Sequence, residues 1–312
     1  MNRRKSLVIG SVLVVLVLIS VFVVVARMGP APPRIVDGYE VVMFDLRTGR
    51  ETLVIGGLDL AGAARFMPDR SVVMHAQING TLGIWHVAPA RSPTLLWEGI
   101  VGAPSPSSDG SRIVFGEHPG GLRILDVGSG TSEAYTRELL GLPEGSGAGS
   151  PSLSRTDDKV IFNWKDGTGP QHIEELYLGT NETRILLTVP DPPTDLHGAA
   201  FLPDGQHAVY ALDGLYLLDL GLNVSFRLTG PGEAGFPRVA GMGRAIVYQV
   251  RGPIDASGRP LFGISVYRLD SQETIEVFAS RQQTRPFPDI DFDGQTILFA
   301  REHYALSSQA SP

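Results

Sequence analysis

Short stretches rich in Val, Ile, Leu, Tyr and Phe recur along most of the chain, separated by Gly, Pro, Asp and Ser residues. β-Branched and aromatic residues between turn-forming residues are typical of β-strands joined by tight turns. After Arg34 an amphipathic helical pattern is almost absent, apart from a single turn around residues 137–140. The pattern therefore predicts an all-β fold.

One arrangement of strands and turns repeats, and it is most complete in residues 201–229. A Pro-Asp-Gly turn at 203–205 leads into strands expected at 207–211, 215–219 and 225–229. Asp and Gly suit such a turn because the carboxylate caps backbone N–H groups and glycine adopts positive φ. Related turns occur at Pro68–Arg70, Ser108–Gly110, Thr156–Asp158, Phe292–Gly294 and, in degenerate form, Gly241–Gly243. Six turns at intervals of about 45 residues predict a β-propeller with six four-stranded blades.

The later strands of the repeat share a second pattern, an apolar strand that in several copies contains an aromatic residue and in two copies ends in Asp. It is found at Gly83–Val87, Leu122–Asp126, Glu175–Leu178 and Ile264–Asp270. Together with the Asp-Gly turns, this pattern resembles the TolB-like, or PD40, subset of WD40-like propellers, and the resemblance covers nearly all of Asp37–Tyr304. It implies the fold and says little about activity, because the motif residues are structural. The additional N-terminal domain of TolB itself has no counterpart between Arg27 and Asp37.

The two ends of the repeat region predict how the ring closes. The last repeat contains its first two strands, near 288–290 and 296–300, and the chain then becomes polar. The missing pair is found near the start, at Glu40–Asp45 and Glu51–Ile55. We therefore expect these N-terminal strands to complete the final blade, in the closure known as velcro, and to cover edges that would otherwise be exposed.

The N-terminus predicts a membrane anchor. Leu7–Ala26 carries no charge and is long enough, as a helix, to span the roughly 30 Å hydrocarbon core. Arg3, Arg4 and Lys5 precede it, so the positive-inside rule places the N-terminus in the cytoplasm and the propeller outside. The alternative is a secreted protein, because Val24 and Ala26 satisfy the small-residue pattern of a signal-peptide cleavage site.

These patterns divide the chain into four parts. We expect a basic start and transmembrane helix at 1–28, a proline-rich stalk at 29–36, the propeller at 37–305 and a disordered tail at 306–312. The proline-rich stalk favours an extended conformation, which separates the anchor from the propeller.

Composition and motifs exclude several kinds of chemistry. The chain has no cysteine, which rules out disulfides, thiolate zinc sites and cysteine nucleophiles. Its net charge of −7 and the lack of a basic patch argue against a nucleic-acid partner. Asp289–Gly294 imitates the start of a calcium loop, but the twelfth position is Ala300 instead of Glu, so a structural turn is expected. The histidines are scattered, and G-x-S-x-G is absent. We therefore predict no enzyme activity, metal or cofactor.

Binding residues are expected on long, irregular loops at one face of the ring, because a rigid scaffold presents variable loops for recognition. The loops are 137–150, 164–174, 190–198 and 251–263, and the candidate residues within them are Trp164, His172, Asp195, His197, Arg251, Asp255 and Arg259. The leading hypothesis is a non-catalytic, membrane-anchored propeller that binds a protein, a peptide or an envelope glycan, with a membrane-embedded partner among the options. One alternative is a lyase or glycan hydrolase that uses polar residues in the central channel. Another is an accessory or sensor subunit of a membrane complex.

Overall fold

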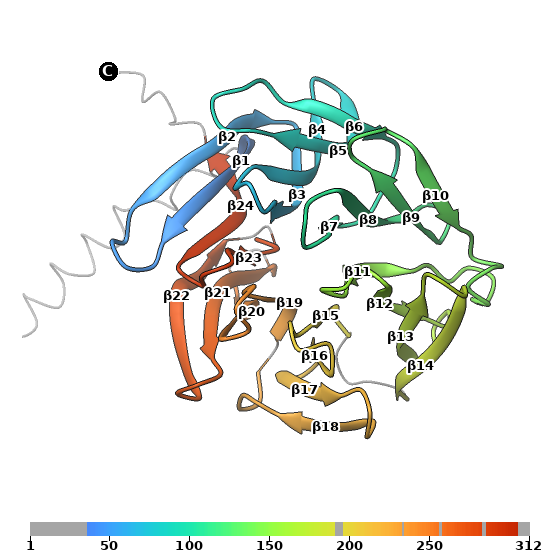
Figure 1. The fold of residues 1–312 in the computed structure, drawn as a ribbon. Helices are drawn as coiled ribbons and strands as arrows, with labels where there is room; N and C mark the ends of the chain where they lie inside the picture. The colour runs from blue at the N-terminus through green and yellow to red at the C-terminus, as the bar shows by residue number, and fades with distance from the viewer. Residues whose placement is uncertain (1–35, 191–195, 233, 256–257, 283–284, 305–312) are drawn as a thin grey trace, which may run out of the picture. The chain divides into compact units, whose positions relative to one another are not determined.

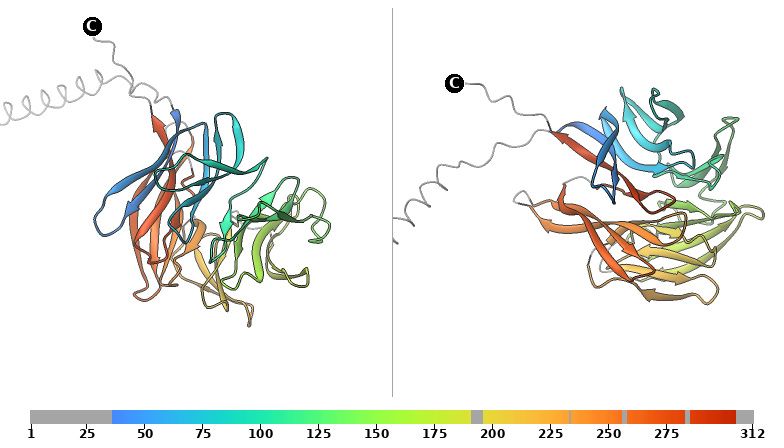
Figure 2. Two further views of the ribbon diagram at one scale, coloured as in Figure 1. Left: turned by 45° about the horizontal axis from the view of Figure 1, so that its top comes forward. Right: turned by 60° about the vertical axis from the view of Figure 1, so that its left-hand side comes forward.

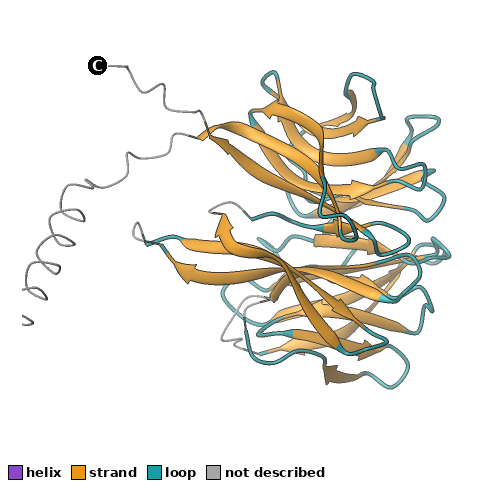
Figure 3. Cartoon of the chain, turned by 90° about the vertical axis from the view of Figure 1, so that its left-hand side faces the viewer, coloured by secondary structure: helices purple, strands orange, loops and turns teal. Residues whose placement is uncertain are grey.

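The computed structural model describes residues 36–190, 196–232, 234–255, 258–282 and 285–304. Within these ranges the strands form six four-stranded sheets around a central axis (Figure 1). Figure 3 shows that the described part of the chain consists of strands and loops. The prediction of an all-β, six-bladed propeller is therefore confirmed.

The predicted anchor lies outside the described residues. The same is true of the basic start, of all but the last residue of the stalk and of the predicted tail at 306–312. In the part of the chain that the structure describes, no helix is long and apolar enough to cross a membrane.

In blades 1 to 5 the four strands are consecutive in the chain, and the first strand of each blade lies nearest the axis (Figures 1 and 2). Blade 1 contains β3 (Leu60–Phe66), β4 (Val72–Ile78), β5 (Thr81–Val87) and β6 (Thr94–Glu98). Blade 2 contains β7 (Ser105–Pro106), β8 (Arg112–Glu117), β9 (Gly121–Asp126) and β10 (Ser132–Tyr135). Neighbouring strands within these blades are antiparallel.

The next three blades follow the same order. Blade 3 contains β11 (Gly149–Leu153), β12 (Lys159–Lys165), β13 (Gln171–Tyr177) and β14 (Glu182–Val189). Blade 4 contains β15 (Ala199–Phe201), β16 (His207–Ala211), β17 (Leu215–Asp219) and β18 (Val224–Arg227). Blade 5 contains β19 (Ala234–Val239), β20 (Ala245–Ile254), β21 (Pro260–Arg268) and β22 (Glu273–Gln282).

Blade 6 joins strands from the two ends of the described chain. From the axis outward it contains β23 (Asp289–Ile290), β24 (Thr296–Tyr304), β1 (Val36–Asp45) and β2 (Glu51–Leu58). The guanidinium of Arg301 on β24 donates hydrogen bonds to the carboxylates of Glu40 on β1 and Glu51 on β2. One side chain thus connects three strands of the blade, and the predicted closure by the N-terminal strands is confirmed.

Apolar side chains fill the spaces between blades. Val41 and Leu58 of the closing strands pack with Met74 of blade 1, and each of these side chains is almost fully buried. On the other side of blade 6, Phe299 belongs to a cluster that includes Val247 of blade 5. Since removing apolar surface from water is the main favourable term in folding, these interfaces hold the blades together.

The recurring Asp residues cap turns, as expected. The carboxylate of Asp109 accepts hydrogen bonds from the N–H of Ser111 at 2.8 Å, from the hydroxyl of Ser111 at 2.8 Å and from the hydroxyl of Ser107 at 2.7 Å. The backbone bond from Ser111, followed by the two hydroxyl bonds, lowers the pKa of Asp109 to about 2. Gly110 follows with a φ of 75°, a conformation that glycine adopts without strain.

We predict that a protein lacking residues 1–56 will unfold at a lower temperature, and less cooperatively, than one lacking residues 1–33. The shorter protein loses β1 and most of β2, which removes Val41 and Val42 from the core and leaves β24 with an unpaired edge. Each such side chain contributes about 1.5–3 kcal/mol by its burial, a large share of a typical stability of about 5–15 kcal/mol. Differential scanning calorimetry would measure the difference, and equal melting temperatures would contradict the closure.

Candidate functional site

The two faces of the ring differ in the loops that they carry. We call upper the face at which the inner strands of the blades begin, and lower the face at which they end. Because strands alternate in direction within a blade, the loops between second and third strands and those between blades lie at the upper face. The remaining hairpin turns, including the Asp-Gly turns, lie at the lower face.

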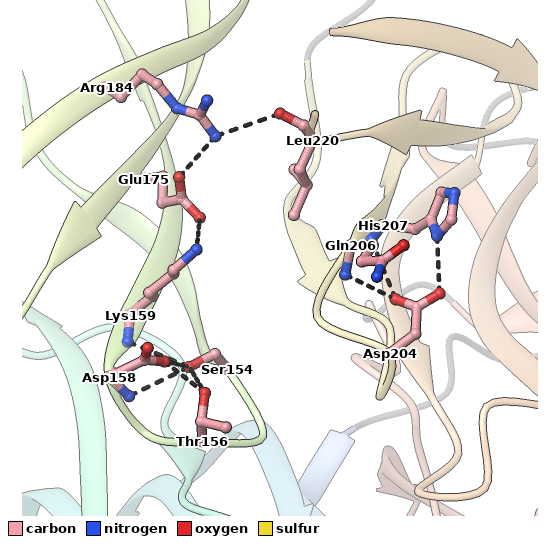
Figure 4. A network of polar contacts seen from close by, with 10 residues as sticks. All are labelled: Ser154, Thr156, Asp158, Lys159, Glu175, Arg184, Asp204, Gln206, His207 and Leu220. Carbon is pink, nitrogen blue, oxygen red and sulfur yellow. Dashed lines mark hydrogen bonds and ion pairs between the residues drawn. The ribbon is translucent and has the colours of Figure 1, made fainter. Parts of the chain in front are cut away.

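Lower-face side chains of blades 3 and 4 form hydrogen bonds and ion pairs with one another (Figure 4). The carboxylate of Asp204 lies 2.7 Å from Nδ1 of His207. In blade 3 the buried carboxylate of Glu175 accepts a 2.8 Å hydrogen bond from Arg184, whose guanidinium also donates to the carbonyl oxygen of Leu220 in blade 4. These contacts fix turns and hold neighbouring blades together, so a structural role explains them.

Two candidate residues lie inside blade 3 and not on a loop. Trp164 on β12 and His172 on β13 are directly paired across the two strands, and their rings stack with centroids 4.0 Å apart. Both side chains are more than nine-tenths buried, and the indole N–H of Trp164 donates a 2.6 Å hydrogen bond to the Glu174 carboxylate. The prediction of a loop at 164–174 was therefore wrong, because the paired strands continue and the connecting loop is only 166–170.

His197 and Arg251 come together at the upper face. His197 precedes β15 of blade 4, Arg251 lies on β20 of blade 5, and both line a cavity of about 110 Å³ with Arg285 and Phe262. The His197 ring stacks on Phe236 at 5.4 Å between centroids. The Arg285 guanidinium lies 5.7 Å from the ring centre of Phe236 and 5.8 Å from that of Phe262. The cavity therefore combines two arginines and a histidine with aromatic walls.

Three candidates remain. Asp255 and Arg259 lie beside this cavity, and Asp195 lies outside the described residues. Asp255 and Arg259 form the turn between β20 and β21: the N–H of Asp255 donates to the Arg259 carbonyl at 2.8 Å, and the N–H of Arg259 donates to the Asp255 carboxylate at 3.0 Å. They lie at the tip of the hairpin that carries Arg251. The prediction of a loop at 251–263 was therefore wrong as well, because the paired strands continue and the connecting loop is only 255–259.

Three buried charged residues lie in the central channel, of which sequence reasoning missed Arg65 and Arg238 and considered Asp289 only as part of the imitated calcium loop. Arg65 on β3, Arg238 on β19 and Asp289 on β23 line a cavity of about 260 Å³ with residues from the inner strands of all six blades. Their exposed fractions are only 2%, 6% and 8%. Arg65 and Arg238 are each the one charged residue of an otherwise apolar inner strand, and this was the signal that could have found them.

An irregularity in β19 brings Arg238 to this position. The pairing of β19 with β20 shifts register between Gly235 and Arg238, and Phe236 within the shift has a φ of 50°. A β-bulge redirects the side chains on either side of it and recurs near functional sites. Here Phe236 contacts the ring of His197, while Arg238 lines the channel.

The described residues that line the channel do not include the groups of a common acid–base site. Among its described lining residues, Asp289 is the single carboxylate and none is histidine. Burial raises the pKa of Asp289, although the charge of Arg65 opposes this shift. In the described part of the chain, no group of three His, Cys, Asp or Glu side chains is placed to hold a metal ion. The turn at Asp291–Gly294 is instead capped by Asp291, which accepts hydrogen bonds from the N–H groups of Gln295 and Thr296.

No protein-family model and no curated protein matches this sequence. Solved structures are similar in fold. A putative TolB from Agrobacterium tumefaciens has a TM-score of 0.66 and 15% identity, and the match covers 85% of this chain and 98% of that one. For TolB from Acinetobacter baumannii the TM-score is 0.55 and the identity 14%, with 88% and 66% covered.

An oligogalacturonate lyase in complex with manganese is similar as well, with a TM-score of 0.56, 13% identity, and 84% of this chain and 77% of that one covered. At such identities the likeness shows the fold, which is that of a TolB-like six-bladed propeller, and it does not transfer an activity.

We predict that Trp164→Phe lowers stability by about 1–3 kcal/mol, because the aromatic stack remains but the buried Glu174 carboxylate loses its donor. Trp85→Phe is the matched control, since the indole N–H of Trp85 is buried without a hydrogen-bond partner. Thermal unfolding of the two variants and the parent protein would test this. If Trp85→Phe destabilised the protein as much as Trp164→Phe, the hydrogen bond to Glu174 would not be the cause.

Proposed function

We propose that this TolB-like propeller is a non-catalytic binding protein whose upper face recognises a protein or peptide partner. The upper cavity carries the proposal, because it places His197, Arg251 and Arg285 beside aromatic rings between three blades. Arginine and the aromatic residues Tyr, Trp and Phe are enriched at the cores of protein interfaces. A cavity of about 110 Å³ suits one inserted side chain from a partner better than a separate small-molecule ligand, whose pockets are usually about 300–1,000 Å³.

The chemistry of the cavity also favours a type of partner. Arg251 and Arg285 place positive charge at this site, although the whole chain has a net charge of −7. An acidic segment would be attracted here and repelled by most of the remaining surface. We therefore favour an acidic protein or peptide over a neutral envelope glycan.

An enzyme that works in the channel is the second hypothesis, since lyase structures share the fold. It would require two carboxylates, or a histidine and a carboxylate, converging on one ligand. The described lining residues supply Asp289 and no histidine. This composition supports the binding hypothesis.

We further propose that the propeller is held outside the cytoplasmic membrane by Leu7–Ala26, with residues 29–36 as a stalk. The charge pattern of Arg3, Arg4 and Lys5 supports this orientation. β1 enters the ring as the third strand of blade 6 and therefore begins at the upper face. A short stalk would then hold the recognition face toward the membrane, which favours a partner in or near the membrane, including the membrane complex of the accessory-subunit hypothesis.

We predict that photo-cross-linking residues at Ile254 and Arg259 will capture the partner, because both positions are exposed at the tip of the β20–β21 hairpin. The matched lower-face positions are Arg155 and Gln206, which are also exposed. Adducts would be identified by mass spectrometry after irradiation of cells that naturally make the protein. Adducts from the lower positions alone would overturn the assignment of the recognition face.

We predict that the mature protein keeps its anchor. Native protein should remain in the membrane fraction after a carbonate wash, and N-terminal peptides should include Leu7–Ala26, because this uncharged run is longer than the usual 7–15-residue core of a signal peptide. Mass spectrometry of the purified protein measures its terminus. A mature terminus at Arg27 or later would show that the protein is cleaved and secreted.

A further inference from the structure

The central channel holds two buried cations whose hydrogen-bonding capacity is largely unused. Arg65 and Arg238 extend from the inner strands of blades 1 and 5 and are 2% and 6% exposed. In Arg65 the Nη1 atom donates to the carbonyl oxygens of Ala64 and Phe287, at 2.8 and 3.1 Å. In Arg238 the Nη1 atom donates only a 3.3 Å hydrogen bond to the carbonyl of Pro237.

The unused donors are the same two atoms in both side chains. Nε and Nη2 of Arg65, and Nε and Nη2 of Arg238, are buried and have no hydrogen-bond partner. These two N–H groups form one edge of the planar guanidinium, and that edge matches the two oxygens of a carboxylate. Buried polar groups are nearly always paired in folded proteins, and a buried charge without a partner is more costly still. Both side chains also line the same cavity, so the channel holds two buried cations that each have unpaired donors.

The charge balance of the channel identifies the sign of that ligand. Asp289, from the blade between those of the two arginines, is the one carboxylate among the described lining residues, and it accepts a 2.8 Å hydrogen bond from the N–H of Phe66. Among the buried charges, two guanidinium groups and one carboxylate leave one positive charge in excess, and the exposed Arg155 adds a further positive charge to the lining. Burial, followed by the nearby charge of Arg65, lowers the pKa of Arg238 to about 9, as expected for a buried cation close to a second cation.

We propose that the central channel binds one carboxylate between the guanidinium groups of Arg65 and Arg238. The carboxylate neutralises the excess charge and supplies acceptors for donors that have none. The opposite wall, from blades 2 and 3, offers the hydroxyl-bearing residues Ser105 and Ser152. This site is distinct from the upper-face cavity, and the proposal does not depend on the function assigned to that face.

The size of the channel limits the source of the carboxylate. A cavity of about 260 Å³ accommodates a small organic acid or the end of a polypeptide, and it excludes a folded domain. The lower turns at Pro68, Ser108, Pro203 and Phe292 also line it, so the cavity extends to the lower end of the channel. Both sources present the same carboxylate to the two arginines, and different probes distinguish them.

Isothermal titration calorimetry of the full chain would test the site with four probes at constant ionic strength. Succinate represents a free acid, and its diamide, succinamide, is the neutral control. A peptide of six uncharged residues with a free C-terminal carboxylate represents a chain end, and the same peptide with a C-terminal amide is its control. Succinate or the free-acid peptide should bind, and the corresponding amide should bind at least about tenfold more weakly, since each tenfold step is about 1.4 kcal/mol.

Arg238→Met and Arg65→Met should each weaken carboxylate binding by about tenfold or more. Arg155→Gln is the matched control, because Arg155 lines the same cavity but is exposed, and this variant should stay within about threefold of the parent protein. Because Arg238→Met removes a buried, poorly paired charge, the variant should remain folded, and its melting temperature should no longer rise with added succinate. Failure of both carboxylates to bind the parent protein, or undiminished binding by Arg65→Met and Arg238→Met, would overturn the proposal.

Discussion

The pairing of β1 with β24 in blade 6 holds the ring closed, and the geometry of both candidate sites depends on it. In the other five blades all strands come from one continuous stretch of chain, so each could form locally. Blade 6 instead requires strands separated by most of the sequence to meet. Arg301 hydrogen-bonds to Glu40 and Glu51 across this junction, and apolar clusters pack on both sides of the blade. Without the junction, two strand edges would be exposed.

Closure also explains how the channel retains poorly paired charges. The arginines of the channel belong to blades 1 and 5, which flank the closing blade, and Asp289 belongs to the closing blade itself. Packing between blades prevents these inner strands from moving apart to hydrate the side chains. The apolar interfaces between blades therefore offset the free-energy cost of burying Arg65 and Arg238. Functional sites in proteins are often locally destabilising and are compensated by packing elsewhere.

Most of the fold could be predicted from the sequence because turns and strands are encoded by residues that are close together in the chain. An Asp-Gly turn and a β-rich strand can be recognised within a few residues, and counting strands at the two ends predicted the closure. The loop predicted at 164–174 was wrong because β12 and β13 remain paired there, with polar residues such as Asn163 and Lys165 alternating with apolar ones at the end of β12. The sequence of one strand does not reveal how that strand pairs with another. Arg65 and Arg238 were missed for a related reason. Their proximity depends on a ring of six blades, and the side-chain direction of Arg238 depends on a bulge within β19.

The upper cavity and the channel share two segments of the chain, β19 and the residues before β23. β19 places Phe236 against His197 at the upper cavity and Arg238 in the channel two residues later. The segment before β23 places Arg285 at the upper cavity, whereas the carbonyl of its Phe287 accepts a hydrogen bond from Arg65. The rings of Phe236 and Phe287 are in contact at 4.6 Å between centroids, and both residues have a positive φ.

Such backbone conformations are costly for non-glycine residues and persist only where the surrounding packing holds them. Phe236 and Phe287 are held in this way by each other and by the groups of the two sites. Arginine side chains line both cavities, in a chain whose net charge is −7. Under the two proposals, an acidic ligand would be attracted to these places by the arginines, and the propeller would select its partners by charge as well as by shape.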